Sequence, residues 1–62
     1  MRKYYFHYRT KNGTMPPKHL NSSFYCQDLE DAVAKAESIN RTITDAFVMH
    51  VEDIDSGEFA YI

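Results

Sequence analysis

One cysteine and three histidines are the side chains of this sequence with the widest range of chemistry, from nucleophilic attack to metal binding. Cys26 precedes a predicted helix, and a thiolate at a helix N-terminus can act as a nucleophile where a base lies nearby. His7, His19 and His50 have no spacing that marks such a base, and the sequence contains neither a C-x-x-C nor an H-x-x-x-H pair. We therefore expect a buried structural cysteine, no catalytic or metal-binding residues, no cofactor and no enzymatic activity.

Four carboxylates lie close together near the C-terminal end of the sequence: Glu52, Asp53, Asp55 and Glu58. Neighbouring carboxylates can bind Ca²⁺ or transfer protons, but this spacing does not match an EF-hand loop. The tripeptide Asp55-Ser56-Gly57 among them is typical of a hairpin loop. We expect a solvated acidic turn that helps to keep the protein soluble.

Charged residues are sorted along the chain. Residues 1–27 carry no acid and five bases: Arg2, Lys3, Arg9, Lys11 and Lys18. Residues 28–62 carry all nine acids and two bases, so the two parts have formal charges of +5 and −7. The bases, interleaved with Tyr and His, could contact phosphates while the rings stack on nucleotides. Alternatively, Lys3 or Arg9 pairs across strands with Glu52, Asp53 or Glu58, and the sequence pI of about 5.8 favours this second interpretation.

The elements that must position these residues follow a β-β-α-β-β order in a single domain of residues 1–62. Runs rich in aromatic and β-branched residues predict the strands, whereas Asn12-Gly13 and Pro16-Pro17 predict a turn and an irregular connection. The expected strands and helix are the following: strands at 3–10, 22–26, 46–54 and 58–62, and a helix at 28–40. We expect an α+β fold in which one amphipathic helix packs on one face of a small antiparallel sheet.

The helix has the clearest pattern of these elements. Its apolar residues recur every three or four positions and form one stripe: Leu29, Ala32, Val33, Ala36 and Ile39. Asp28 is a suitable N-cap, and acidic residues in the first turn favour the positive end of the helix dipole. The small alanines allow the helix to lie close to a sheet.

One helix can cover one face of the sheet, so the other face should stay open. Alternation in the first strand places Tyr4, Phe6 and Tyr8 on the better core face, and Lys3, Tyr5, His7 and Arg9 on the other. In the third strand it separates Phe47, Met49 and Val51 from Ala46, Val48, His50 and Glu52, without deciding which set points inward. We expect the open face to hold six residues: Tyr5, His7, Val48, His50, Ala60 and Ile62.

Such a mixed apolar and aromatic surface indicates contact with a partner. The candidate interaction surface combines the open face with the basic residues of the first strand and the following loop: Tyr5, His7, Arg9, Lys11, Lys18, Val48 and His50. Three partners suit such a surface: a second copy of the chain, another protein or a nucleic acid.

Composition indicates the cellular compartment in which we expect the protein. A lone cysteine predicts a reducing compartment, and the longest apolar run, Ala46–Met49, is far too short for a membrane span. No apolar stretch follows Arg2 and Lys3, so we expect no signal peptide and a cytoplasmic protein. Chains of this length without catalytic motifs are common among phage and accessory genes.

We expect a protein-interaction or regulatory module that forms a homodimer through the open sheet face or an edge strand. The alternative is a nucleic-acid-binding protein that uses the first strand and the loop between Lys11 and Lys18.

Overall fold

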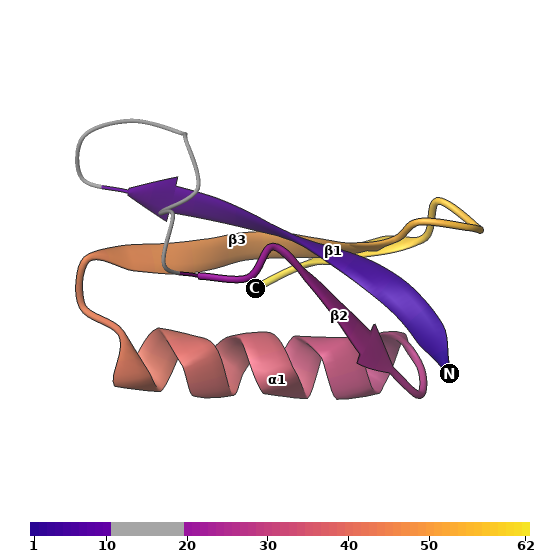
Figure 1. The fold of residues 1–62 in the computed structure, drawn as a ribbon, viewed down its shortest axis with the longest axis horizontal. Coiled ribbons are helices and arrows are strands. Elements are labelled where there is room, and N and C mark those ends of the chain that lie inside the picture. The colour runs from indigo at the N-terminus through magenta and orange to yellow at the C-terminus, as the bar shows by residue number, and fades with distance from the viewer. Residues whose placement is uncertain (11–19) are drawn as a thin grey trace.

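The computed structural model of the protein describes residues 1–10 and 20–62. The elements follow in this order: β1 (Arg2–Thr10), β2 (Ser23–Cys26), α1 (Leu29–Thr42), β3 (Ala46–Asp53) and β4 (Phe59–Tyr61). The strands form a four-stranded antiparallel sheet in the order β2-β1-β3-β4. Helix α1 lies along one side of this sheet (Figure 1). The α+β fold with β-β-α-β-β order is confirmed.

Helix α1 begins where its sequence predicts. Asp31 donates its backbone N–H to Asp28 Oδ1 at 2.8 Å, and Gln27 donates its backbone N–H to Asp31 Oδ2 at 3.1 Å. These reciprocal bonds satisfy backbone donors that a helix N-terminus otherwise leaves without partners. The helix ends at Thr42, two residues beyond the expected Asn40, and the N–H of Ile43 still donates to Ile39 O at 3.0 Å.

The core lies between α1 and the sheet face it covers. Tyr4, Phe6 and Tyr8 of β1 are buried there, as their alternation predicts. They meet the two fully buried alanines of the helix, Ala32 and Ala36. Because alanine is small, the helix backbone can approach the aromatic rings closely. The hydroxyl of Tyr8 keeps a hydrogen-bond partner in this apolar layer, because it donates to Asn21 O at 2.7 Å.

The central pair of strands is irregular, and this changes which side chains face the helix. His7 lies opposite His50 and Tyr8 lies opposite Val48, so Met49 has no partner on β1. An extra residue of this kind is a β-bulge, and it reverses the alternation of the residues that follow. Val48 and Val51 therefore both point toward the helix and are fully buried.

Two sequence predictions fail at this bulge and in the strand beyond it. Val48 was expected on the open face but is buried in the core, because strict alternation does not survive the extra residue. Ala60 was also expected there, but it lies opposite Val51 and packs against the core. Phe59 and Tyr61 occupy the open face of β4 in its place, and Ile62 lies beyond the end of the strand.

Asn40 fastens the helix to β3 beside the bulge. Its Nδ2 donates to Val48 O at 3.2 Å, and its Oδ1 accepts the N–H of Val48 at 2.7 Å. On the same strand, Met49 O accepts the N–H of Ile62 at 2.9 Å. The amide of Asn40 thus acts as a strand partner for one residue of β3.

The hairpin between β3 and β4 is organised by a buried carboxylate rather than a fully solvated one. Asp53 is 2% exposed, and its Oδ1 accepts the backbone N–H groups of Asp55 at 2.9 Å and Ser56 at 3.3 Å. Gly57 takes a positive φ of 78°, which glycine adopts without strain. Asp55 and Glu58 are exposed, as expected for a solvated acidic turn. The expectation is wrong for Asp53, whose carboxylate is buried.

Candidate interaction surface on the open face of the sheet

The sheet face opposite α1, called here the open face, gathers side chains from all four strands. Residues directly opposite each other on neighbouring antiparallel strands share a face, so the register identifies its members. They are Lys3, Tyr5, His7 and Arg9 of β1, Ser23 and Tyr25 of β2, Phe47, His50 and Glu52 of β3, and Phe59 and Tyr61 of β4. Most of these side chains carry an aromatic ring.

The rings contact one another in a continuous row across the three strands β1, β3 and β4. The centroid of Tyr5 lies 4.8 Å from that of His7, and His7 stacks on His50 at 4.0 Å with 18° between the ring planes. His50 then meets Tyr61 edge-on at 5.8 Å. Phe59 lies 5.4 Å from Tyr61 and perpendicular to it. The row is therefore a packed structure on a face that none of the other described elements covers.

Solvent reaches much of this aromatic surface. Tyr61 is 75% exposed and Tyr25 is 66% exposed, while Phe47 and Phe59 are each about half exposed. Single exposed apolar residues are normal on a protein, but a contiguous patch marks an interaction site. The open face meets that description because its rings are neighbours both along the strands and across them.

Charges of both signs flank the rings. Lys3 places its Nζ 5.9 Å from the ring centroid of Tyr25, and Arg9 lies on the same face near the other end of β1. Glu52 lies opposite Tyr5, and its Oε1 is 3.4 Å from His7 Nε2. That nitrogen is buried and has no hydrogen-bond partner among the described residues.

The ion pair that joins the basic and acidic parts of the chain uses Arg2 rather than Lys3 or Arg9. Arg2 Nη1 donates to Asp53 Oδ2 at 2.6 Å. Burial of the Asp53 carboxylate opposes its ionisation, yet hydrogen bonds from Arg2, Asp55 and Ser56 hold its pKa below the ordinary value. Neither Lys3 nor Arg9 forms an ion pair within residues 1–10 and 20–62.

His50 is disposed to stay neutral. Desolvation is the larger cause that lowers its pKa, the proximity of His7 adds to it, and Glu52 opposes both. The His7 ring stacks at 4.0 Å, and a positive charge on it would repel one on His50, which is why this neighbour lowers the pKa of His50.

The structure brings together four of the seven residues of the candidate interaction surface. Tyr5, His7, Arg9 and His50 lie on the open face, Val48 lies in the core, and Lys11 and Lys18 lie outside the described residues. Sequence reasoning missed four rings of this face: Tyr25, Phe47, Phe59 and Tyr61. The high aromatic content was visible, but assigning these rings to one face required the strand register.

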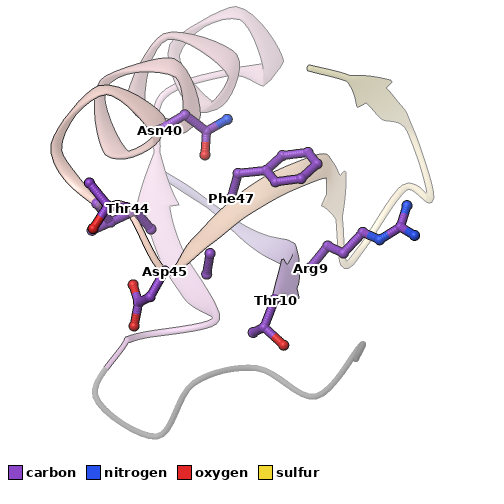
Figure 2. A pocket seen from close by; sticks show the side chains of 8 residues that line it. Arg9, Thr10, Asn40, Thr44, Asp45 and Phe47 are labelled. Atoms are coloured by element: carbon purple, nitrogen blue, oxygen red, sulfur yellow. The ribbon is translucent and has the colours of Figure 1, made fainter. Parts of the chain in front are cut away.

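A pocket of about 550 Å³ continues from the open face around one end of the sheet. Arg9 and Phe47 line it from the open face, and Asn40, Thr44 and Asp45 line it from the end of α1 and the loop before β3 (Figure 2). A smaller pocket of about 380 Å³ lies near the other end of α1, and its lining includes Arg2, Asp28 and Glu30. The described residues contain no group of three or more His, Cys, Asp or Glu side chains placed to hold a metal ion.

Cys26 is 1% exposed, which confirms the prediction of a buried cysteine. Burial is the main cause that raises the pKa of its thiol, and Asp31 contributes in the same direction. The thiolate, which is the nucleophilic form, is therefore disfavoured at this position.

Within the part of the chain that the structure describes, no helix has the length and apolar character to cross a membrane. Comparison with known protein families, with curated proteins and with solved structures finds no match for this chain.

Proposed function

We propose that this protein is a cytoplasmic protein-interaction module that acts by binding rather than by catalysis, and that it forms a homodimer through its open face. The observation that carries the proposal is the row of exposed, mutually packed rings that runs from Tyr5 through the histidine pair to Tyr61. Aromatic side chains are enriched at protein interfaces because they bury a large area at a low cost in side-chain entropy.

The charge pattern of the open face supports a second copy as the partner. A twofold interface brings one surface patch against itself, so that patch must be self-complementary. The open face carries Lys3 and Arg9 near the two ends of β1 and Glu52 on the neighbouring strand. Two such faces can place a cation of each protomer against the Glu52 of the other. Small domains with thin cores also commonly gain stability by association.

Nucleic acid is the less suitable occupant of this face. Exposed rings beside Lys3 and Arg9 would suit base stacking and phosphate contacts. Glu52, however, lies opposite Tyr5 within the same row, and its carboxylate would repel a phosphate backbone there. Of the acids described, Glu52 is the one that the register places on the open face. Removing its charge therefore distinguishes a nucleic-acid partner, which should bind more tightly, from a second copy of the chain.

Sedimentation equilibrium at neutral pH tests the proposal. We expect the wild-type chain to sediment at twice its 7.3 kDa mass. Tyr61→Glu should weaken dimerisation by about tenfold or more, because it places a charge among the apposed rings. Ser38→Glu is the matched control, since it adds the same charge on the exposed side of α1, where Lys35 and Arg41 are neighbours at i−3 and i+3.

A monomeric wild-type chain, or a Tyr61→Glu variant that dimerises as tightly as wild type, would contradict the proposal. An oligonucleotide of mixed sequence should bind neither strongly nor with a steep dependence on salt. Tight, salt-sensitive binding that Arg9→Ala weakens and Glu52→Gln strengthens would instead identify the open face as a nucleic-acid interface.

A further inference from the structure

The two histidines lie at the centre of the open face. They are directly opposite each other on β1 and β3, which are the two inner strands of the sheet. Their rings stack at 4.0 Å with 18° between the planes. A partner that covers the open face must therefore cover this pair.

The groups around the pair come from three strands, β1, β3 and β4. On β1, Tyr5 lies 4.8 Å from His7, and Arg9 is the next residue on the same face. On β3, Glu52 Oε1 lies 3.4 Å from His7 Nε2. On β4, Tyr61 and Phe59 lie 5.8 Å and 6.2 Å from His50. Glu52 is thus the one described carboxylate beside two imidazoles, and Arg9 is the cation next along β1.

We propose that the stacked pair of His7 and His50 makes dimerisation through the open face dependent on pH, with the dimer favoured while His50 is neutral. This inference rests on the proposed function, because it describes how that same interface is regulated. Histidine is the side chain whose charge ordinarily changes near neutral pH.

The physical reason is desolvation of the pair by the second copy. In the free chain, water can still solvate a protonated imidazole at the surface. In the dimer this water is displaced, and the rings of Phe59 and Tyr61 that contact His50 carry no charge to replace it, while Glu52 lies against His7. A twofold interface applies this penalty once in each protomer, so formation of one dimer is coupled to the release of two protons, one from each protonated His50.

The direction of the pH effect follows from linkage. The pKa of His50 already lies below its usual 6.5 in the free chain, because of desolvation and the neighbouring His7. Covering the face lowers that pKa further, so a protonated His50 must release its proton when the dimer forms. Dimerisation is therefore strongest above about pH 6.5 and weakens as the pH falls through and below the pKa of the free chain.

Sedimentation equilibrium at about pH 7.5 and about pH 5.5 tests the inference, since carboxylates ordinarily stay ionised over this range. For the wild-type chain we expect the dimer dissociation constant to rise severalfold at the lower pH. His50→Phe keeps a ring in the row but cannot take up a proton, so its dissociation constant should change by less than about threefold. His19→Gln is the control, because it removes the remaining histidine of the sequence and should keep the wild-type response.

The outcomes separate the inference from the function on which it rests. A wild-type dimer at pH 7.5 that is equally tight at pH 5.5 overturns the inference and leaves the proposed function standing, whereas a monomer at pH 7.5 overturns both. A pH response that His50→Phe retains also overturns the inference. His50→Gln provides a second non-titrating variant, and far-UV circular dichroism at both pH values establishes that each protein is folded.

Discussion

The two faces of the sheet contain similar residue types but have different environments. On β1, the helix-side face carries Tyr4, Phe6 and Tyr8, and the open face carries Tyr5 and His7 between them. The first three are buried, while Tyr5 remains 39% exposed. Burial here is decided by which face α1 covers, because aromatic side chains are abundant on both.

This difference shows what the open face still lacks. On the helix side, small residues of α1 fill the space above the rings and exclude water. On the open face the described residues supply no such layer, and the rings are covered by one another alone. A second copy would supply a layer of rings in place of a helix. The two faces should therefore respond differently to the same substitution.

A charge introduced at neighbouring positions of β3 should give the largest contrast. Val48→Glu buries an unpaired carboxylate at a fully buried site, which costs several kcal/mol. A chain of 62 residues has a total unfolding free energy of roughly 3–9 kcal/mol, so this variant should be largely unfolded. Phe47→Glu changes the adjacent residue on the open face and should give a folded monomer.

Far-UV circular dichroism and sedimentation together measure these two outcomes. A folded Val48→Glu variant would mean that the strand does not place Val48 toward the helix. An unfolded Phe47→Glu variant would show that the open face already contributes to the core of the single chain.

Truncation on β1 gives the next largest contrast. Phe6→Ala removes a fully buried ring and should lower the unfolding free energy by about 3–5 kcal/mol. Tyr5→Ala, one residue away on the open face, should cost about 1 kcal/mol or less in the monomer, as an exposed cross-strand contact does. Urea denaturation at a protein concentration below the dimer dissociation constant measures both values. Equal losses in the two variants would abolish the distinction between the faces.

The sequence predicts the elements better than it predicts the faces. The apolar stripe of α1 and the Asp28 cap are local patterns, so the helix and its start could be placed without any tertiary information. The alternation of β1 was also readable, because its paired partner carries the extra residue. The bulge at Met49 has no glycine or other local signal, and it places Val48 on the other face than strict alternation predicts. The faces of β4 depend instead on its own register with β3.

The row of rings on the open face also could not be predicted from the sequence. Its components come from three strands, and their proximity depends on the register of β1 with β3 and of β3 with β4. Composition indicated many aromatic residues and alternation placed Tyr5 and His7 correctly. Phe59 and Tyr61 could be added only when the pairing of Glu52 with Phe59 and His50 with Tyr61 was known.

Substitution of Asn40 tests how firmly the helix is held to β3 beside the bulge. Asn40→Ala removes both hydrogen bonds to the backbone of Val48 and should lower the unfolding free energy by about 1–3 kcal/mol. Asn40→Asp keeps the acceptor for the Val48 N–H but loses the donor, so it should retain part of the stability. Amide hydrogen exchange of Val48 measures the local effect. Exchange as slow in Asn40→Ala as in wild type would show that this bond does not protect the strand.

Acid titration compares the buried carboxylate of Asp53 on the helix side with the half-exposed carboxylate of Glu52 on the open face, and we expect the smallest effect here. The pKa of Asp53 is depressed in the folded chain, so below its ordinary 3.8 the unfolded chain binds the proton more readily. The stability contributed by Asp53 is therefore present above that pH and is lost as the pH falls toward the folded pKa. Thermal melts between about pH 5 and about pH 3 should show this decline in wild type and Glu52→Gln, and a shallower decline in Asp53→Asn. A decline that Glu52→Gln flattens as much as Asp53→Asn would mean that the pairing of Arg2 with Asp53 does not set the acid response of the fold.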